Sequence, residues 1–96
     1  MTGESRVAEI GKALAHPARV QMLRLLADGQ RCGCEFAPLL QIDPSVVSRY
    51  LAVLARAGLV ASRRDGVRVM WRLIDASILD ILQQIEDLAA AREGTR

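Results

Sequence analysis

The stretch that decides the fold is Asp43 to Val60, DPSVVSRYLAVLARAGLV. Asp43 and Pro44 are residue types that cap and open a helix, and Gly58 is the type that ends one. At about 100° per residue, one side of this helix is apolar and contains Val47, Tyr50, Leu51, Leu54 and Ala57. The other side has no acid and contains Ser45, Ser48, Arg49, Ala52 and Arg56. A small, basic face of this kind fits the major groove of DNA.

The residues after this helix change from a helical period to that of strands. The sequence LVASRRDGVRVMWRLI, residues 59–74, alternates around Asp65-Gly66, which is a strong hairpin signal. Alternation predicts one face with Val67, Val69, Trp71 and Leu73, and another with Arg68, Met70 and Arg72. We therefore expect a two-stranded wing whose tip gathers Arg63, Arg64 and Arg68.

Four further helices are predicted from apolar spacing and breakers. The first runs over residues 5–15, and the second begins at Pro17 and stops at Asp28-Gly29. A short third helix begins near Cys34 and buries Phe36, Leu39 and Leu40, and a last helix opens at Asp75 with an apolar stripe of Ile78, Leu82, Ile85 and Leu88. The fold class is mainly α with a two-stranded β-wing. Residues 1–96 form a single winged helix-turn-helix domain, with the helix-turn-helix at about 34–57 and the wing at about 59–73.

Charge and composition bound the function. The segment from Arg49 to Arg72 contains six arginines and one acid, whereas the formal charges in the rest of the chain sum to −3. This distribution favours contact with a polyanion through one face of the protein. No apolar run approaches the roughly 20 residues of a membrane span, so no membrane partner is expected. The start MTGESRVAEI lacks the features of a secretory signal, so we expect a reducing, cytoplasmic location and no structural disulfide.

The two cysteines form a Cys32-Gly33-Cys34 triplet. In a regular helix their side chains would point roughly 200° apart, so one ion could not touch both sulfurs. We expect Gly33 to let the backbone leave helical geometry, so that the two sulfurs converge. Three readings stay open: a pair of buried small residues, a reversible thiol switch (although a disulfide across one residue strains ordinary geometry), and a site for a thiol-binding ligand.

The chain from Leu14 to Leu73 resembles the ArsR/SmtB family of bacterial metal-responsive repressors. The matching motifs are LAHPARVQMLRLLADG, CGCE, DPSVVSRYLAVLARAGLV and SRRDGVRVMWRL. The resemblance implies a homodimer through the first and last helices, with two recognition helices in successive major grooves of operator DNA. It also implies that ligand binding lowers operator affinity and releases transcription.

The effector follows in part from the same resemblance. The family's arsenic site adds a third cysteine three residues after the pair, where this chain has Ala37. We expect As(III), as arsenite or a methylated arsenical, at Cys32 and Cys34, with water, hydroxide or an external thiol in the third position. Cu(I) or Hg(II), thiol oxidation, and a repressor without a metal effector stay open as alternatives. Zinc is not expected because the last helix has no histidine, and no cofactor is required.

The predicted DNA contacts divide into two groups. Ser45, Ser48 and Arg49, with Arg56, are assigned to base edges or nearby phosphates, and the wing arginines are assigned to phosphates. His16 is expected to be a helix cap or surface residue. No phosphate loop, nucleophile triad or pair of catalytic carboxylates is evident, so we do not expect an enzyme. Two alternatives remain: a winged helix that contacts only protein, and a monomer that packs internally both the stripe of the last helix and that of the first helix, formed by Val7, Ile10 and Leu14.

Overall fold

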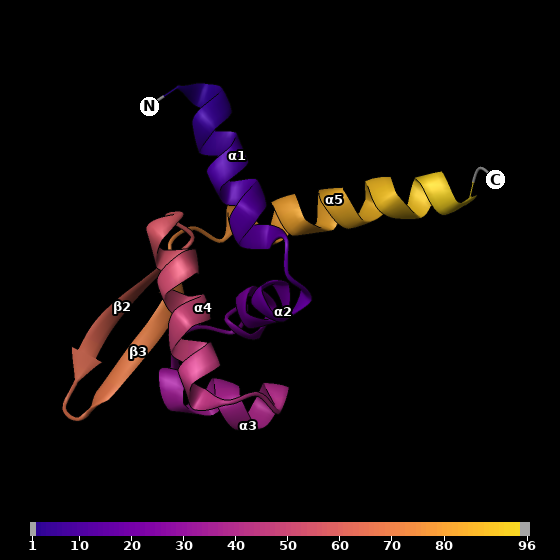
Figure 1. The fold of residues 1–96 in the computed structure, drawn as a ribbon. Helices are drawn as coiled ribbons and strands as arrows, with labels where there is room; N and C mark the ends of the chain where they lie inside the picture. Colours follow the sequence, from indigo (N-terminus) through magenta and orange to yellow (C-terminus); the bar gives the residue numbers. More distant parts are fainter. Residues whose placement is uncertain (1, 95–96) are drawn as a thin grey trace.

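The computed structural model describes residues 2–94, and its elements follow the predicted order (Figure 1). The elements are α1 Gly3–Leu14, α2 Pro17–Leu25, β1 Arg31–Cys32, the 3-10 helix η1 Gly33–Glu35, α3 Phe36–Leu40, α4 Pro44–Arg56, β2 Val60–Asp65, β3 Arg68–Leu73 and α5 Ser77–Gly94. This confirms a mainly α, winged helix-turn-helix fold, in which α3 and α4 form the helix-turn-helix.

Both ends of α4 and the start of α2 lie where the sequence predicted them, whereas α2 ends at Leu25, before Asp28-Gly29. The side chain of Asp43 caps α4 by accepting a hydrogen bond from the backbone N–H of Ser45 at 2.8 Å, and Pro44 occupies the first turn. Gly58, just after α4, has a φ of 80°, which an L side chain rarely adopts. His16 caps α2, because its Nδ1 accepts from the N–H of Ala18 at 3.2 Å, so its prediction as a cap is confirmed.

The sheet has a third strand that the sequence did not predict. β1 pairs antiparallel with β3, with Arg31 opposite Trp71 and Cys32 opposite Met70, and the strand order is β1-β3-β2. The predicted two-stranded wing is confirmed as β2 and β3, and β1 extends its sheet by one strand. A strand of two residues cannot show a period of two, so only the tertiary pairing reveals it.

The turn of the wing is shifted by one residue from the prediction. Asp65 pairs with Arg68, so the two-residue loop is Gly66-Val67 and not Asp65-Gly66. Gly66 has a φ of 63° and Val67 has no positive φ, which fits a type II′ turn with glycine at its first central position. Val67 is consequently 97% exposed at the tip and does not share the packed face of the strand.

The third helix begins later than predicted. Residues Gly33–Glu35 form a single turn of 3-10 helix, and α3 covers only Phe36–Leu40 before Gln41 takes a left-handed φ of 55°. Phe36 is fully buried as predicted, whereas Leu39 is 52% exposed, so its predicted burial is wrong. Leu40 is partly buried against the core.

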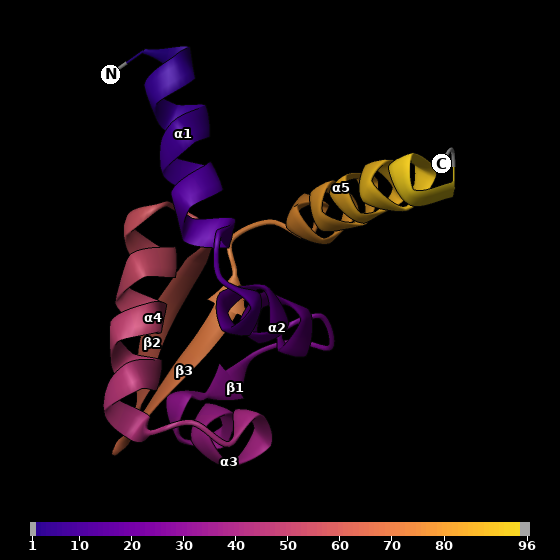
Figure 2. The same cartoon turned by 45° about the vertical axis from the view of Figure 1, so that its right-hand side comes forward.

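The core lies where α2, α3 and α4 meet the sheet (Figures 1 and 2). Its largest fully buried side chains are Phe36, Met22, Leu23, Leu54 and Val60. Each such side chain stabilises the fold by about 1.5–3 kcal/mol relative to leaving it in water. This core holds α4 with its polar side outward.

Helices α1 and α5 extend away from this body (Figures 1 and 2). Ile78 and Leu82 of α5 are buried against the body, but Ile85 and Leu88 farther along are 51% and 66% exposed. Val7 of α1 is 72% exposed. The alternative in which one chain covers both stripes is therefore wrong. Within residues 2–94, none of the helices combines the length and the apolar character that crossing a bilayer demands.

Candidate DNA-binding surface and cysteine site

The exposed face of α4 has the composition that the sequence predicted. Ser45, Ser48, Arg49 and Arg56 are exposed, while the opposite face is buried through Val47, Leu51 and Leu54. The helix therefore presents hydroxyl and guanidinium donors outward and is anchored by aliphatic packing behind them. Which bases or phosphates these side chains contact stays a prediction.

Ser45 has a structural role as well as its predicted one. Its hydroxyl donates to Oδ1 of Asp43 at 2.6 Å, in addition to the backbone hydrogen bond. These two bonds, the hydroxyl first, lower the pKa of Asp43 below its ordinary value, because both stabilise the carboxylate. With its proton engaged, the Ser45 hydroxyl can only accept from a DNA base, which restricts it to donor groups in the groove.

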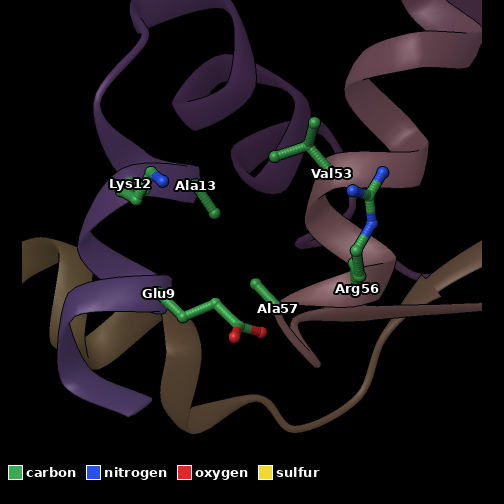
Figure 3. A pocket seen from close by; sticks show the side chains of 6 residues that line it. All are labelled: Glu9, Lys12, Ala13, Val53, Arg56 and Ala57. Carbon is green, nitrogen blue, oxygen red and sulfur yellow. The ribbon is translucent and has the colours of Figure 1, made fainter. Parts of the chain in front are cut away.

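Arg56 lies apart from the other α4 residues. It is eleven positions beyond Ser45, or about 16 Å along the helix axis at roughly 1.5 Å per residue. Figure 3 shows it at a hollow between α1 and α4 lined by Glu9, Lys12, Ala13, Val53, Arg56 and Ala57. Because recognition helices read bases mainly with their N-terminal residues, Arg56 is better placed for backbone phosphate than for base edges.

Tyr50 joins the recognition helix to the α1–α2 junction, which the sequence did not predict. Its hydroxyl lies 3.0 Å from Nε2 of His16, and its ring centroid is 5.1 Å from the guanidinium carbon of Arg19 and 6.0 Å from that of Arg49. These distances allow cation–π attraction on an otherwise apolar face. In the sequence, Tyr50 occupies an apolar position of the helical pattern, and this pattern does not reveal that its ring also contacts two arginines.

Arg19 extends this connection to α1. Its Nε donates to the carbonyl oxygen of Ala13 at 2.8 Å, and its Nη2 donates to that of Lys12 at 3.0 Å. These bonds are made to carbonyls in the last turn of α1, of which that of Lys12 also accepts from the backbone N–H of Ala15 at 3.2 Å. Arg49 is thus linked through Tyr50 and Arg19 to the end of α1.

The wing arginines gather at the tip as predicted. Arg63, Arg64 and Arg68 are exposed, and the register places them within the three residue pairs nearest the turn. Nε of Arg63 also donates to Oε1 of Gln30 at 3.0 Å. The wing is consequently fixed to the segment that leads into β1 and the cysteines.

Cys32 and Cys34 form a disulfide, with their Cα atoms 5.1 Å apart. The predicted convergence of the sulfurs is confirmed, but the expectation of no disulfide is wrong. The predicted role of Gly33 is also wrong, since its φ lies outside the left-handed region. Convergence comes instead from Cys32, whose extended backbone (φ −62°, ψ 138°) precedes the 3-10 turn.

Gly33 is required for close packing. A Cβ added to it would lie 3.1 Å from Nε1 and 3.4 Å from Cδ1 of Trp71, and 3.8 Å from Cδ1 of Leu51. The first distance is shorter than ordinary carbon–nitrogen contacts, so a side chain here would push on Trp71. The glycine lets the cysteine turn approach the wing.

Hydrogen bonds surround the cysteine pair. The backbone N–H of Cys32 donates to Oε2 of Glu35 at 2.8 Å, and that of Cys34 lies 3.2 Å from the Cys32 sulfur. Glu35 also forms an ion pair with Nη1 of Arg31 at 3.2 Å, while Nε of Arg31 donates to the carbonyl oxygen of Leu25 at 2.6 Å. The pair is therefore held between the end of α2 and the start of α3.

The pair borders both predicted DNA-contacting elements. One hollow joins Gly33 and Cys34 to residues of α3 and α4, including Ser48, and a second joins the pair to Val67, Arg68 and Val69 of the wing. Cys32 is 5% exposed, whereas Cys34 is exposed. Among residues 2–94, no group of three or more histidine, cysteine or carboxylate side chains could hold a metal ion. The two sulfurs therefore supply only two donors.

Comparison with known proteins agrees with this geometry. A family model described as "Bacterial regulatory protein, arsR family" matches residues 16–62. An uncharacterized HTH-type transcriptional regulator of Methanocaldococcus jannaschii is 31% identical over 84 residues, covering 86% of this chain and 94% of the relative. A transcriptional repressor SmtB homolog of Synechocystis is 32% identical, covering 85% of this chain and 62% of the relative. A homodimeric winged helix-turn-helix DNA-binding domain from Mycobacterium bovis, solved by NMR, has a TM-score of 0.83 at 30% identity, covering 96% of this chain and 85% of that one.

Proposed function

Because the chain belongs to the ArsR family of bacterial regulatory proteins, we propose that it is a cytoplasmic transcriptional repressor controlled by thiol chemistry at Cys32 and Cys34. Its role is regulatory and not enzymatic, in keeping with relatives named as transcriptional regulators. The observation that carries the proposal is the cysteine pair, bonded to each other at the start of the helix-turn-helix and paired with the wing.

Operator DNA is the proposed partner. Ser48 and Arg49 lie on the exposed face of α4, and the wing tip adds three arginines that can neutralise phosphates. Affinity should accordingly fall steeply with salt, because each neutralised phosphate releases bound cations. A winged helix that contacts only protein would not show this dependence on DNA and salt.

A homodimer is the proposed assembly. Val7, Ile85 and Leu88 are more than half exposed on the two helices that extend from the body. Covering each such side chain is worth up to about 1.5–3 kcal/mol. The homodimeric state of the Mycobacterium bovis relative supports the same arrangement. Dimerisation through α1 and α5 would leave both α4 helices free to enter DNA grooves.

The controlling reaction that the structure supports best is reversible oxidation. Two cysteine thiols lose two protons and two electrons to a peroxide or a small disulfide, and the Sγ–Sγ bond forms. The reduced form binds the operator in this proposal. Oxidation favours the released state, because the bond constrains the turn that supports α3 and touches the wing. By thermodynamic linkage, operator binding must disfavour oxidation of the two cysteines by the same free energy by which oxidation weakens operator binding.

Trivalent arsenic is the second candidate, and the convergence of the sulfurs favours it. Two sulfurs close enough to bond to each other can also bind one As(III), which leaves a third position for water, hydroxide, an external thiol or a methyl group. Linear Cu(I) or Hg(II) needs its two sulfurs on opposite sides of the ion, so the turn would have to open. Glu35 does not supply a third ligand readily, because its carboxylate is committed to Cys32 N–H and Arg31.

Fluorescence anisotropy on DNA from the protein's own promoter tests the proposal. The reduced protein should bind, and hydrogen peroxide or arsenite should release it. Cys32→Ser and Cys34→Ser should keep operator binding and lose release by both reagents. Release of the serine variants to the same extent as the unaltered protein would refute control by the pair. Release by arsenite alone would assign the effector to arsenic and set the redox role aside.

A further inference from the structure

The disulfide shares a face of the sheet with an arginine of the wing. Cys32 is directly opposite Met70, and Arg68 is two residues before Met70 on the same strand. Side chains two positions apart on a strand point the same way, and diagonal neighbours across an antiparallel pair lie about 7–8 Å apart. Arg68 and the cysteines also line one hollow, which we call the Arg68 hollow; its residues are Cys32, Gly33, Cys34, Val67, Arg68 and Val69.

The two cysteines that line this hollow are not equally exposed. Cys34 is exposed, whereas Cys32 is 5% exposed. An incoming nucleophile therefore reaches the sulfur of Cys34 and displaces that of Cys32. Asp65 lies directly opposite Arg68 across β2 and β3, but no ion pair joins Arg68 to Asp65 or to another acid within residues 2–94, so the guanidinium can bind a ligand.

We propose that the Arg68 hollow binds low-molecular-weight thiols that carry a carboxylate, with Arg68 holding the carboxylate while the thiolate attacks Cys34. The inference rests on the disulfide of the proposed function and names the class of reductant that resets it. Val67 and Val69 border the hollow on the wing side, so a short aliphatic chain between thiol and carboxylate fits it. A carboxylate paired with a guanidinium can form two parallel hydrogen bonds, which orients the attacking sulfur.

The reaction balances in two steps. The thiolate RS⁻ attacks Sγ of Cys34, forming the RS–Sγ bond and breaking the bond between the two cysteines, and the released Cys32 thiolate takes a proton from water. A second RS⁻ then attacks the sulfur that the first thiolate contributed to the mixed disulfide. RSSR leaves, and Cys34 becomes a thiolate. The protein gains two electrons, and two molecules of the thiol are oxidised.

The test compares two reagents on the oxidised, full-length protein. Mercaptoacetate reacts as a dianion and 2-mercaptoethanol as a monoanion, and the loss of disulfide is followed by acid quench, alkylation and mass spectrometry. Each reagent's rate on Arg68→Gln is divided by its rate on the unaltered protein, so the intrinsic reactivity of the thiol cancels. Arg72→Gln is the matched control, because Arg72 is an exposed arginine of the same strand that lies outside the hollow.

Arg68→Gln should slow mercaptoacetate about 3-fold to 10-fold more than it slows 2-mercaptoethanol, the size of one charge interaction at about 4 Å in bulk water. Arg72→Gln should slow the two reagents equally. Equal slowing of both reagents by Arg68→Gln, or the same discrimination by Arg72→Gln, would overturn carboxylate binding. Failure of the purified protein to form the disulfide would overturn the redox proposal and this inference together. If Arg68→Gln slows mercaptoacetate selectively but the oxidised and reduced proteins bind the operator equally, only the proposed control of DNA binding is refuted.

Discussion

Replacement of Gly33 by alanine separates two physical roles that a glycine can have at the cysteine turn. If Gly33 were needed only for flexibility, an alanine that fits the observed backbone would stabilise the protein by about 0.4–1 kcal/mol, through lower entropy of the unfolded chain. The structure predicts the opposite sign. The new Cβ would be 3.1 Å from Nε1 of Trp71, so the indole must move by a few tenths of an ångström.

Overpacking of this kind costs about 1–3 kcal/mol, and the entropic gain offsets part of it. We expect Gly33→Ala to lower the free energy of unfolding by about 1 kcal/mol, which corresponds to a fall in Tm of about 4–8 °C for a domain of this size. Urea denaturation of the reduced protein at one fixed concentration measures this, since dimerisation makes stability depend on concentration.

A second background tests the cause. In Trp71→Leu the contact is removed, so the added methyl group of Gly33→Ala should be neutral or stabilising by up to about 1 kcal/mol. The coupling energy between the two changes is then roughly 1–2 kcal/mol, in the range found for residues in contact. An equal loss of stability in both backgrounds would refute the close approach of the cysteine turn to Trp71.

Four further predictions test other parts of the structure. Arg49→Ala should reduce operator affinity by about 1–3 kcal/mol with an unchanged circular dichroism spectrum, and unchanged affinity in anisotropy titrations would refute its role in recognition. Tyr50→Leu should weaken the preference for operator over random DNA because Arg49 loses its support, while Tyr50→Phe retains the ring and most of the preference; equal losses in both variants would argue against cation–π support. Because the pKa of Asp43 is lower in the folded protein than its ordinary value of 3.8, its carboxylate stabilises the fold above pH 3.8, and this stabilisation is lost as the pH falls through the folded pKa. The urea midpoints of Asp43→Asn and the unaltered protein should therefore converge in acid. A difference in midpoint that stays constant down to pH 2 would contradict this. Leu88→Glu should give monomers in light scattering, whereas Leu39→Glu, at an exposed leucine of α3, should not; dimers in both would place the interface elsewhere.

The larger elements could be predicted because their signals are local. Asp43, Pro44 and Gly58 mark the ends of α4, and its two faces follow from helical spacing alone. The exposed stripes of α1 and α5 were also predictable, because a chain of this length has few other surfaces to cover them. The exposed positions of the predicted DNA-contacting residues follow from the same patterns.

The cysteine region could be predicted only in part, because its geometry depends on contacts distant in sequence. β1 exists through pairing with β3, thirty-eight or more residues later, and a two-residue segment has no pattern of its own. The tight contact of Gly33 with Trp71 depends on that pairing. The support that Tyr50 gives Arg49 likewise needs Arg19, which lies on another helix.

The measurement that tests the central claim most directly is the operator Kd of one protein preparation in its dithiol and disulfide forms, with the thiol content determined by mass spectrometry. The disulfide form should bind about 5-fold to 150-fold more weakly, the usual range of coupling between two sites, and reduction should restore the original Kd. Equal Kd values for the two forms would contradict control of DNA binding by oxidation of Cys32 and Cys34.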